Sequence, residues 1–400
     1  MGELPLATFM WLLLLAFAVS LGAEKLRVPY APALAITGLV AGLFPVLKDA
    51  VLSPHLLLSV LLPSLLFEGA LHISAASLKR DLLPVSILAT VGTVAAALFT
   101  AWLLQRVLHL PEAACLAFGC LIAATDPISV IALFRRIGAP DRLTLIVEAE
   151  SLLNDGMAAA LYMAAVGSFS RGTGFTVASV GIPLLIGTLG GALVGGALGW
   201  VASRIHSHLD DPLMDLTLTA LLAYGSYLVS SALNVSGVIA VIAAGLVAGN
   251  LGLFGTMSDK ARDSVVAFWE FAAFVANSMV FLLVGFSASR AHWLSMPMVV
   301  LGAIVSVLFG RLTVYPLLLI SSRAGGRVPA NWCHVLWWGG LRGALSLALA
   351  LALPAGFPDR NVVISATFGV VIFSLIIQGL TINLLVVRLN LAAEKVVQAK

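Results

Sequence analysis

Apolar stretches follow one another along almost the whole chain, separated by short polar segments. A bilayer core about 30 Å thick is crossed by a helix of about 20 apolar residues. By that measure the sequence predicts about thirteen spans, at residues 4–23, 28–47, 51–74, 82–105, 112–134, 143–169, 175–203, 213–232, 235–251, 265–289, 296–321, 330–353 and 362–387. Only 10% of the 400 residues are charged, against about a quarter in soluble domains. We therefore expect an all-α polytopic membrane protein.

The positive charges divide unequally between the two sides of this layout. The loops after even-numbered spans contain only Lys48, Arg106, Arg171, Arg290 and Arg360. Arg311 and Arg342 fall inside spans, and the other 15 of the 22 lysines and arginines lie in or beside the loops after odd-numbered spans. Because cytoplasmic loops are enriched in Lys and Arg, we expect an outside N-terminus and a cytoplasmic C-terminus. No soluble domain interrupts the pattern, so residues 1–400 are predicted to form one membrane domain.

Ionisable residues inside spans are costly and mark functional sites by default. Five occur at positions where the flanking sequence is apolar or glycine-rich, and they are Glu68, Asp126, Glu150, Asp155 and Arg342. The segment "AATDPISV" contains the most informative of them. Pro127 lacks an N–H and disfavours the α conformation at Asp126, so a helix is expected to break near Thr125 and Asp126. Such a break frees backbone carbonyls that a cation can bind together with the Thr125 hydroxyl and the Asp126 carboxylate. The alternative is a simple kink with Asp126 capping the second half-helix. The cation site and the capping role are compatible with each other.

The segment "EAESLLNDG" places four polar groups on one helix. Ser151 and Asp155 are four residues apart and share a face, while Glu150 and Asn154 share the adjoining face. Ser151 and Asp155 can therefore offer oxygen ligands to a hard cation such as Na⁺. A polar stripe that only holds helices together is the alternative, and two carboxylates make it less favourable.

Arg342 in "WWGGLRGALSL" is permanently charged and needs a partner inside a span. Glu150 is the preferred partner, because its side chain points away from Ser151 and the expected cation site. The alternative is that Arg342 lies near a span end and extends its charged group to the membrane interface. Glycines 339, 340 and 343 permit close backbone approach or a second helix break. Glu68, in "LLPSLLFEGAL", joins the ion site, lines its access path, or sits near the interface.

These residues predict secondary transport. A carboxylate in a partly dry cavity holds either H⁺ or Na⁺ but not both, and this competition is sufficient for exchange. Asp155 is the expected carrier, and its neutral neighbour Asn154 predicts one proton exchanged per cation. K⁺/H⁺ exchange on the same site and, in a different class, a cation channel are the alternatives. No nucleophile–base or metal-ligand spacing appears, so neither enzyme activity nor a cofactor is expected.

Several motifs together resemble one known family. "FEGAL", "ATDP", "EAESLLNDG", "NVSGVIAVIAAGLVAGN" and "GGLRGALSLALAL" occur in order between residue 67 and about residue 350. The set looks like the monovalent cation:proton antiporter-1 family, the NhaP-type and animal-exchanger branch of Na⁺/H⁺ antiporters. The resemblance implies a Na⁺ (Li⁺)/H⁺ antiporter of the cell membrane that functions in pH homeostasis, with no nucleic-acid partner.

The resemblance also implies particular roles and a fold. It places the cation ligands on Thr125, Asp126, Ser151, Asp155 and, in some members, Glu68, with Asn154 beside the carrier Asp155, Pro127 at the helix break and a buried ion pair between Glu150 and Arg342. The implied fold is NhaA/NhaP-like, with inverted repeats and discontinuous helices. It forms a homodimer in which each protomer has a dimerisation domain and a core domain that moves like an elevator. We expect no counterpart of the long cytosolic regulatory tail that some members have.

Overall fold

The chain folds into helices throughout the part that the structure describes. The computed structural model describes residues 6–26, 28–43, 53–206, 211–251, 257–290, 292–324 and 328–391, and no strand occurs in these ranges. Parts of the predicted spans 4–23, 28–47 and 51–74 lie outside the described residues, as do the loop charges Arg27, Lys48, Arg327, Lys395 and Lys400. The all-α fold predicted from hydropathy is confirmed.

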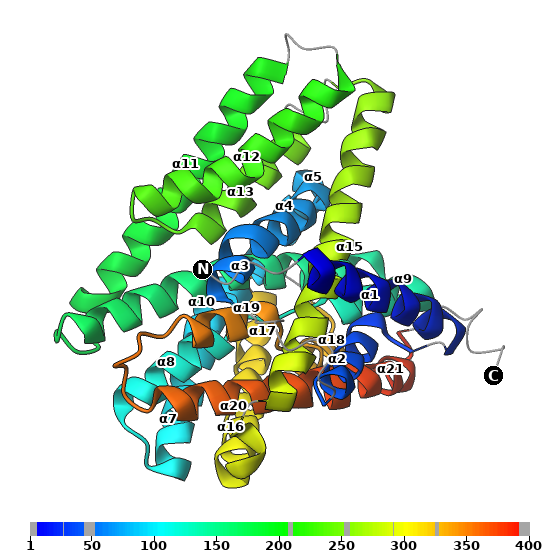
Figure 1. The fold of residues 1–400 in the computed structure, drawn as a ribbon. Coiled ribbons are helices and arrows are strands. Elements are labelled where there is room, and N and C mark those ends of the chain that lie inside the picture. The colour runs from blue at the N-terminus through cyan, green and yellow to red at the C-terminus, as the bar shows by residue number, and fades with distance from the viewer. Residues whose placement is uncertain are drawn as a thin grey trace.

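The helices of the first half run as follows (Figure 1). They are α1 (Leu6–Leu26), α2 (Tyr30–Ala41), α3 (Pro54–Leu56), η2 (Leu57–Leu61), α4 (Leu62–His72), α5 (Ala75–Arg80), α6 (Leu82–Ile87), η3 (Leu88–Gly92), α7 (Thr93–Leu108), α8 (Glu112–Ile122), α9 (Ile128–Ile137) and α10 (Asp141–Ser170). The η2 and η3 turns are π-helical and continue into α4 and α7 without interruption.

The second half has the same all-helical character. It contains η4 (Val177–Gly181), α11 (Ile182–His206), α12 (Pro212–Ala232), α13 (Gly237–Leu251), α15 (Asp259–Arg290), η5 (His292–Ser295), α16 (Pro297–Gly310), η6 (Arg311–Thr313), α17 (Val314–Arg323), α18 (Trp332–Trp338), α19 (Ala344–Leu351), α20 (Arg360–Phe373), η7 (Ser374–Gln378) and α21 (Gly379–Arg388). The longest of these, α15, runs through the molecule from the end occupied by α11 and α12 toward α20 (Figure 1).

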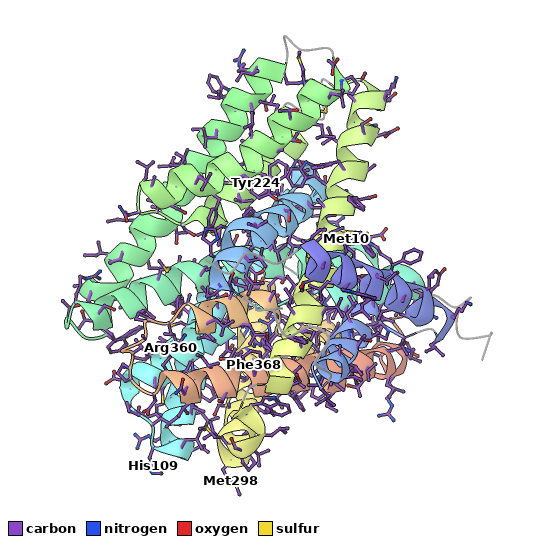
Figure 2. All side chains as sticks on the ribbon, in the orientation of Figure 1. Met10, His109, Tyr224, Met298, Arg360 and Phe368 are labelled. Carbon is purple, nitrogen blue, oxygen red and sulfur yellow. The ribbon has the colours of Figure 1, made fainter. Side chains whose placement is uncertain are left out.

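Each of the thirteen predicted ranges contains helix. By length and composition, eight helical stretches of the described chain can cross a membrane, and shorter apolar helices occur at Tyr30–Ala41, Glu112–Ile122 and Gly237–Asn250. Large apolar side chains cover the outside, and Figure 2 shows Met10 and Met298 pointing away from the helices, 56% and 75% exposed. An apolar surface of this kind is stable in lipid. The number of crossings and their orientation stay predictions.

The helices that pack most extensively on one another fall into two groups. In one, α2 packs on α15, and α13 packs on α4, α11 and α12. In the other, α7, α8, α10, α16, α19 and α20 pack on one another. Figure 1 shows α11, α12 and α13 side by side at one end, and α7, α16 and α20 at the other. The predicted division into a dimerisation domain and a core domain is compatible with these groups and stays a prediction.

Glycine allows the closest helix contacts in the first group. A Cβ on Gly285 would lie 2.0 Å from the Ala35 carbonyl oxygen, so α15 and α2 touch backbone to backbone. A Cβ on Gly195 would likewise lie 2.0 Å from the Ala240 oxygen between α11 and α13. Small residues give membrane helices their packing surface, because lipid provides no hydrophobic driving force between helices.

Two helices are interrupted within the second group. The chain leaves the helix between α8 and α9, at residues 123–127, and again between α18 and α19, at residues 339–343. The break expected at Thr125 and Asp126 is confirmed, and the second break, left open by the glycines, is present. The two extended stretches contact each other, because the Asp126 N–H donates to the Leu341 carbonyl at 2.7 Å. This crossing positions the candidate site.

Candidate functional site

The crossing of the two interrupted helices is held by Arg342. Its guanidinium donates to the carbonyl oxygens of Ala123 and Ala124 at 2.8 and 3.0 Å, and its backbone N–H donates to Ser374 Oγ at 2.7 Å. These carbonyls belong to the end of α8, where no further turn can bind them. A cation near the C-terminal end of a helix is also favoured by the helix dipole. Arg342 therefore satisfies backbone groups that the break leaves free.

Asp126 lies at the centre of the crossing. Its Oδ1 accepts a hydrogen bond of 3.2 Å from the Ile128 N–H in the first turn of α9, so the predicted capping contact is present. Its Oδ2 lies against Gly343 of the other break, where an added Cβ would be 2.2 Å away. The carboxylate thus fits only because residue 343 has no side chain.

We expect Gly343→Ala to reduce transport strongly, since the methyl group would displace Asp126. A catalytic or binding group that is moved by about 1 Å can cost about 100-fold in rate. Gly225→Ala is the matched control, because an added Cβ at Gly225 on α12 meets no atom within 4 Å. Equal ion flux in the two variants, reconstituted at equal protein content, would contradict this reading of Asp126.

The polar stripe of α10 binds the first break directly. Ser151 Oγ donates to the Thr125 carbonyl at 2.5 Å and accepts from Thr125 Oγ1 at 3.2 Å. Asn154 Nδ2 donates to Thr125 Oγ1 at 3.2 Å and to Glu150 Oε1 at 3.3 Å. One face of α10 therefore fixes the broken segment of its neighbour, and Asn154 is fully buried behind that segment.

Asp155 adds an acceptor without a partner to this group. Its Oδ1 is buried and accepts no hydrogen bond from the described residues, and the same is true of Asn154 Oδ1. A buried acceptor left unpaired in a membrane is unfavourable by several kcal/mol. An acceptor of this kind, beside a cavity, is suited to hold a proton or a cation.

A cavity of about 130 Å³ adjoins these groups. Its polar lining residues are Glu68, Thr125, Asp126, Glu148, Ser151, Asp155, Asn277 and Ser346. The structure thus brings all the predicted cation ligands to one cavity, with Pro127 of the break beside them. Asn154 does not line the cavity and contacts it only through Thr125. Glu68, near the end of α4, lies 3.3 Å from His72 and lines the cavity.

The predicted pairing of Glu150 with Arg342 is wrong. Glu150 is bound by Arg311, whose Nη1 and Nη2 donate to Oε1 and Oε2 at 2.9 and 3.1 Å. Arg311 Nε also donates to the Leu336 carbonyl at 3.3 Å. This bidentate contact uses two guanidinium nitrogens at once, while Arg342 donates to the carbonyls of Ala123 and Ala124. Both members of the observed pair are buried, at 2% and 6% exposure.

The sequence interpretation missed three residues near the site. Arg311 lies inside the predicted span 296–321, which contains no acidic residue. Its need for an acidic partner from another span was the signal that could have identified it. Glu148, an acid inside the predicted span 143–169, borders the cavity together with Glu68. Asn277, a single amide in the apolar segment "FVANSMVFLLVG", also borders it.

Two interrupted helices crossing beside buried acids, in a polytopic α-helical protein, define a membrane transporter of the discontinuous-helix class. The family model for the transmembrane sodium/hydrogen exchanger matches residues 12–388. The chain therefore belongs to the sodium/hydrogen exchanger family.

Individual relatives agree with this assignment along nearly the whole chain. The Na⁺/H⁺ antiporter ApNhaP of Aphanothece halophytica is 38% identical, over 99% of this chain and 78% of the relative. The Na⁺/H⁺ antiporter NhaG of Bacillus atrophaeus is 36% identical, over 95% and 74%. The solved structure of the sodium proton antiporter MjNhaP1 from Methanocaldococcus jannaschii superposes with a TM-score of 0.77 at 25% identity, over 95% of this chain and 97% of that one. The NhaP-like fold expected from the motifs is confirmed.

Proposed function

We propose that this protein is a secondary antiporter of the cell membrane that exchanges Na⁺ or Li⁺ for H⁺. The observation that carries the proposal is the unpartnered Oδ1 of Asp155 at a cavity that also presents oxygens of Asp126, Thr125 and Ser151. Carboxylate and hydroxyl oxygens are the ligands that hard cations prefer. The relatives named above support Na⁺ as the cargo, and no feature of the site favours K⁺ exchange or a channel.

Competition at Asp155 is the proposed mechanism. A bare carboxylate inside the membrane is unfavourable, so the site is stable when either a proton or a cation neutralises it. Binding one displaces the other. The loaded site crosses from one side to the other, and the empty charged site does so rarely, which couples the two ion gradients.

The surrounding charges support an exchange of one proton per cation. Arg311 neutralises Glu150 with two hydrogen bonds, and Asn154 beside Asp155 is neutral. Asp126 Oδ1 already accepts a hydrogen bond from the Ile128 N–H, whereas Asp155 Oδ1 has no partner among the described residues. Asp155 is then the single group that gains and loses a proton in the cycle.

We expect Na⁺-driven H⁺ flux to be unchanged by an imposed membrane potential. A cycle that moved a net charge would gain or lose about 2.3 kcal/mol per 100 mV. Proteoliposomes clamped at different potentials with K⁺ and valinomycin measure this directly. A rate or end point that follows the potential would contradict the exchange of one proton for one cation.

The cavity is proposed to open to the cytoplasm in this conformation. Glu68 lies one turn before the end of α4, and the predicted loop between spans 51–74 and 82–105, which forms the short helix α5, contains Lys79 and Arg80. Glu148, also on the cavity, lies near the beginning of α10, after Arg135 and Arg136. These loops belong to the predicted cytoplasmic side. Two acids at the mouth favour the approach of a cation.

A ΔpH assay in proteoliposomes with Na⁺, Li⁺ and K⁺ compared across pH tests the proposed function. We expect dissipation of ΔpH on addition of Na⁺ or Li⁺ and a much weaker response to K⁺. Dissipation by K⁺ alone would assign the same site to K⁺/H⁺ exchange. Conductance without obligatory proton movement would assign the protein to the channels.

A further inference from the structure

Asn277 is a half-buried amide on α15 beside several buried apolar residues. Its neighbours Ala276, Met279, Val280 and Phe281 are at most 3% exposed. Ser278, the other polar residue here, is satisfied by the Phe274 carbonyl at 2.5 Å and by Tyr30. The Asn277 side chain makes no hydrogen bond to any described residue, and it borders the cavity that contains Asp155. The amide is therefore free to contact an ion in that cavity.

The cavity is lined by two walls of different composition and by residues 343–346 at the second break, where Ser346 Oγ is a buried hydroxyl without a hydrogen-bond partner among the described residues. The predicted cation ligands Thr125, Asp126, Ser151 and Asp155 all belong to the first break and to α10. The facing wall consists of α4 and α15, where Glu68 and Asn277 are the polar residues among apolar ones. Glu68 is engaged with His72 near the end of α4. Asn277 therefore contributes the neutral oxygen of that wall.

The ligand oxygens of the first wall are partly used already. Asp126 Oδ1 accepts from Ile128, and the Thr125 carbonyl accepts from Ser151. A cation at Asp155 would keep a side open toward α4 and α15, across a cavity of only about 130 Å³. Hard cations bind several oxygen ligands. An amide oxygen adds affinity without adding charge, so it leaves the one-for-one exchange intact.

We propose that Asn277 is a cation-affinity and selectivity residue, which contributes its amide oxygen from the facing wall to the cation held at Asp155. The inference rests on the proposed function and extends it, because it assigns a ligand to the wall that contains none of the predicted acids except Glu68. A purely structural role would make Asn277 important for folding but would leave the ratio of Na⁺ to Li⁺ affinity unchanged.

The test is Asn277→Leu, which keeps the approximate shape and removes the oxygen. The purified protein is heated at increasing NaCl or LiCl, with choline chloride holding the ionic strength constant, and the midpoint concentration of ion-dependent thermal stabilisation is measured. KM and the maximal rate of Na⁺-driven H⁺ flux are measured in proteoliposomes. Asn277→Ser, which keeps an oxygen at shorter reach, is the second variant. Thr188→Val, which removes an unpartnered buried hydroxyl on α11 away from this cavity, is the control.

We expect Asn277→Leu to raise the Na⁺ midpoint and KM by about tenfold, the lower end of the cost of losing a supporting group at a metal site. The maximal rate should change little, the Na⁺ to Li⁺ ratio should shift, and Asn277→Ser should fall between wild type and Asn277→Leu. Midpoints and ion ratios equal to wild type in either folded variant would overturn the inference. If Asn277→Leu does not fold, Asn277→Ser decides by the same criterion.

The outcome for Asn277 is separable from the proposed function. Wild-type exchange together with unchanged affinity in the Asn277 variants would reject this inference and leave the antiporter assignment intact. Absence of Na⁺-driven H⁺ flux in the wild type would reject the antiporter assignment. Thermal stabilisation by Na⁺ would then still decide whether Asn277 contributes to a cation site.

Discussion

Replacing Asp155 with Asn is expected to abolish Na⁺-driven H⁺ flux in proteoliposomes. The variant keeps the shape of the side chain but can neither hold a proton in exchange nor offer a charged oxygen to a cation. Its Oδ1 has no partner among the described residues, so the change breaks none of their hydrogen bonds to that atom. We therefore expect transport to be lost while thermal stability without Na⁺ is kept or increased, since an uncompensated buried charge is removed.

The matched control for this prediction is Asp359→Asn. Asp359 is exposed and has a positive φ of 49°, a conformation that Asn adopts readily. The chemical change is the same, but Asp359 does not line the cavity, so wild-type flux is expected. Near-normal exchange in Asp155→Asn, with the protein correctly reconstituted, would refute the role of Asp155 as the ion carrier.

Replacing Arg311 with Met is expected to destabilise the protein more than any other single change proposed for the site. The variant leaves the Glu150 carboxylate buried at 2% exposure without its two charged hydrogen bonds. Removing one partner of a buried ion pair costs about 3–5 kcal/mol. A large drop in the thermal unfolding temperature of the purified protein is the measurement, with loss of transport as a consequence.

A double-mutant comparison separates Arg311 from Arg342. Adding Glu150→Leu to Arg311→Met should recover most of the stability, because replacing a whole buried pair with apolar residues is often neutral. Adding Glu150→Leu to Arg342→Met should give no such recovery, since Arg342 donates to the carbonyls of Ala123 and Ala124 instead. Recovery with Arg342 and none with Arg311 would restore the pairing first expected from the sequence.

Local chemistry made the interrupted helix predictable. Proline removes a donor and constrains the residue before it, so Asp126–Pro127 identified the break without knowledge of the rest of the fold. The i,i+4 spacing of Ser151 and Asp155 likewise predicted that their side chains share a face, because both residues belong to one helix. The structure brings both to the same cavity as Thr125.

The partner of Glu150 could not be predicted in this way. Two arginines, Arg311 and Arg342, fall inside spans, and helix periodicity gives the direction of Glu150 only relative to its own helix. Which arginine reaches it depends on how α10, α16 and the second break pack. The glycine at position 340 contributes, because an added Cβ there would lie 2.8 Å from Arg311 Nε. Asn277 escaped notice for a related reason, since only the packing of α15 reveals that it faces the cavity.

Proton release on Na⁺ binding tests the central claim most directly. Titration calorimetry of the purified protein with NaCl, in two buffers of different ionisation enthalpy, gives the number of protons released per Na⁺ bound. Competition at Asp155 predicts that this number approaches one at the acidic end of the active pH range and falls toward zero as the pH rises. It also predicts that Asp155→Asn shows neither the release nor the binding. Na⁺ binding without proton release at every pH would contradict the account.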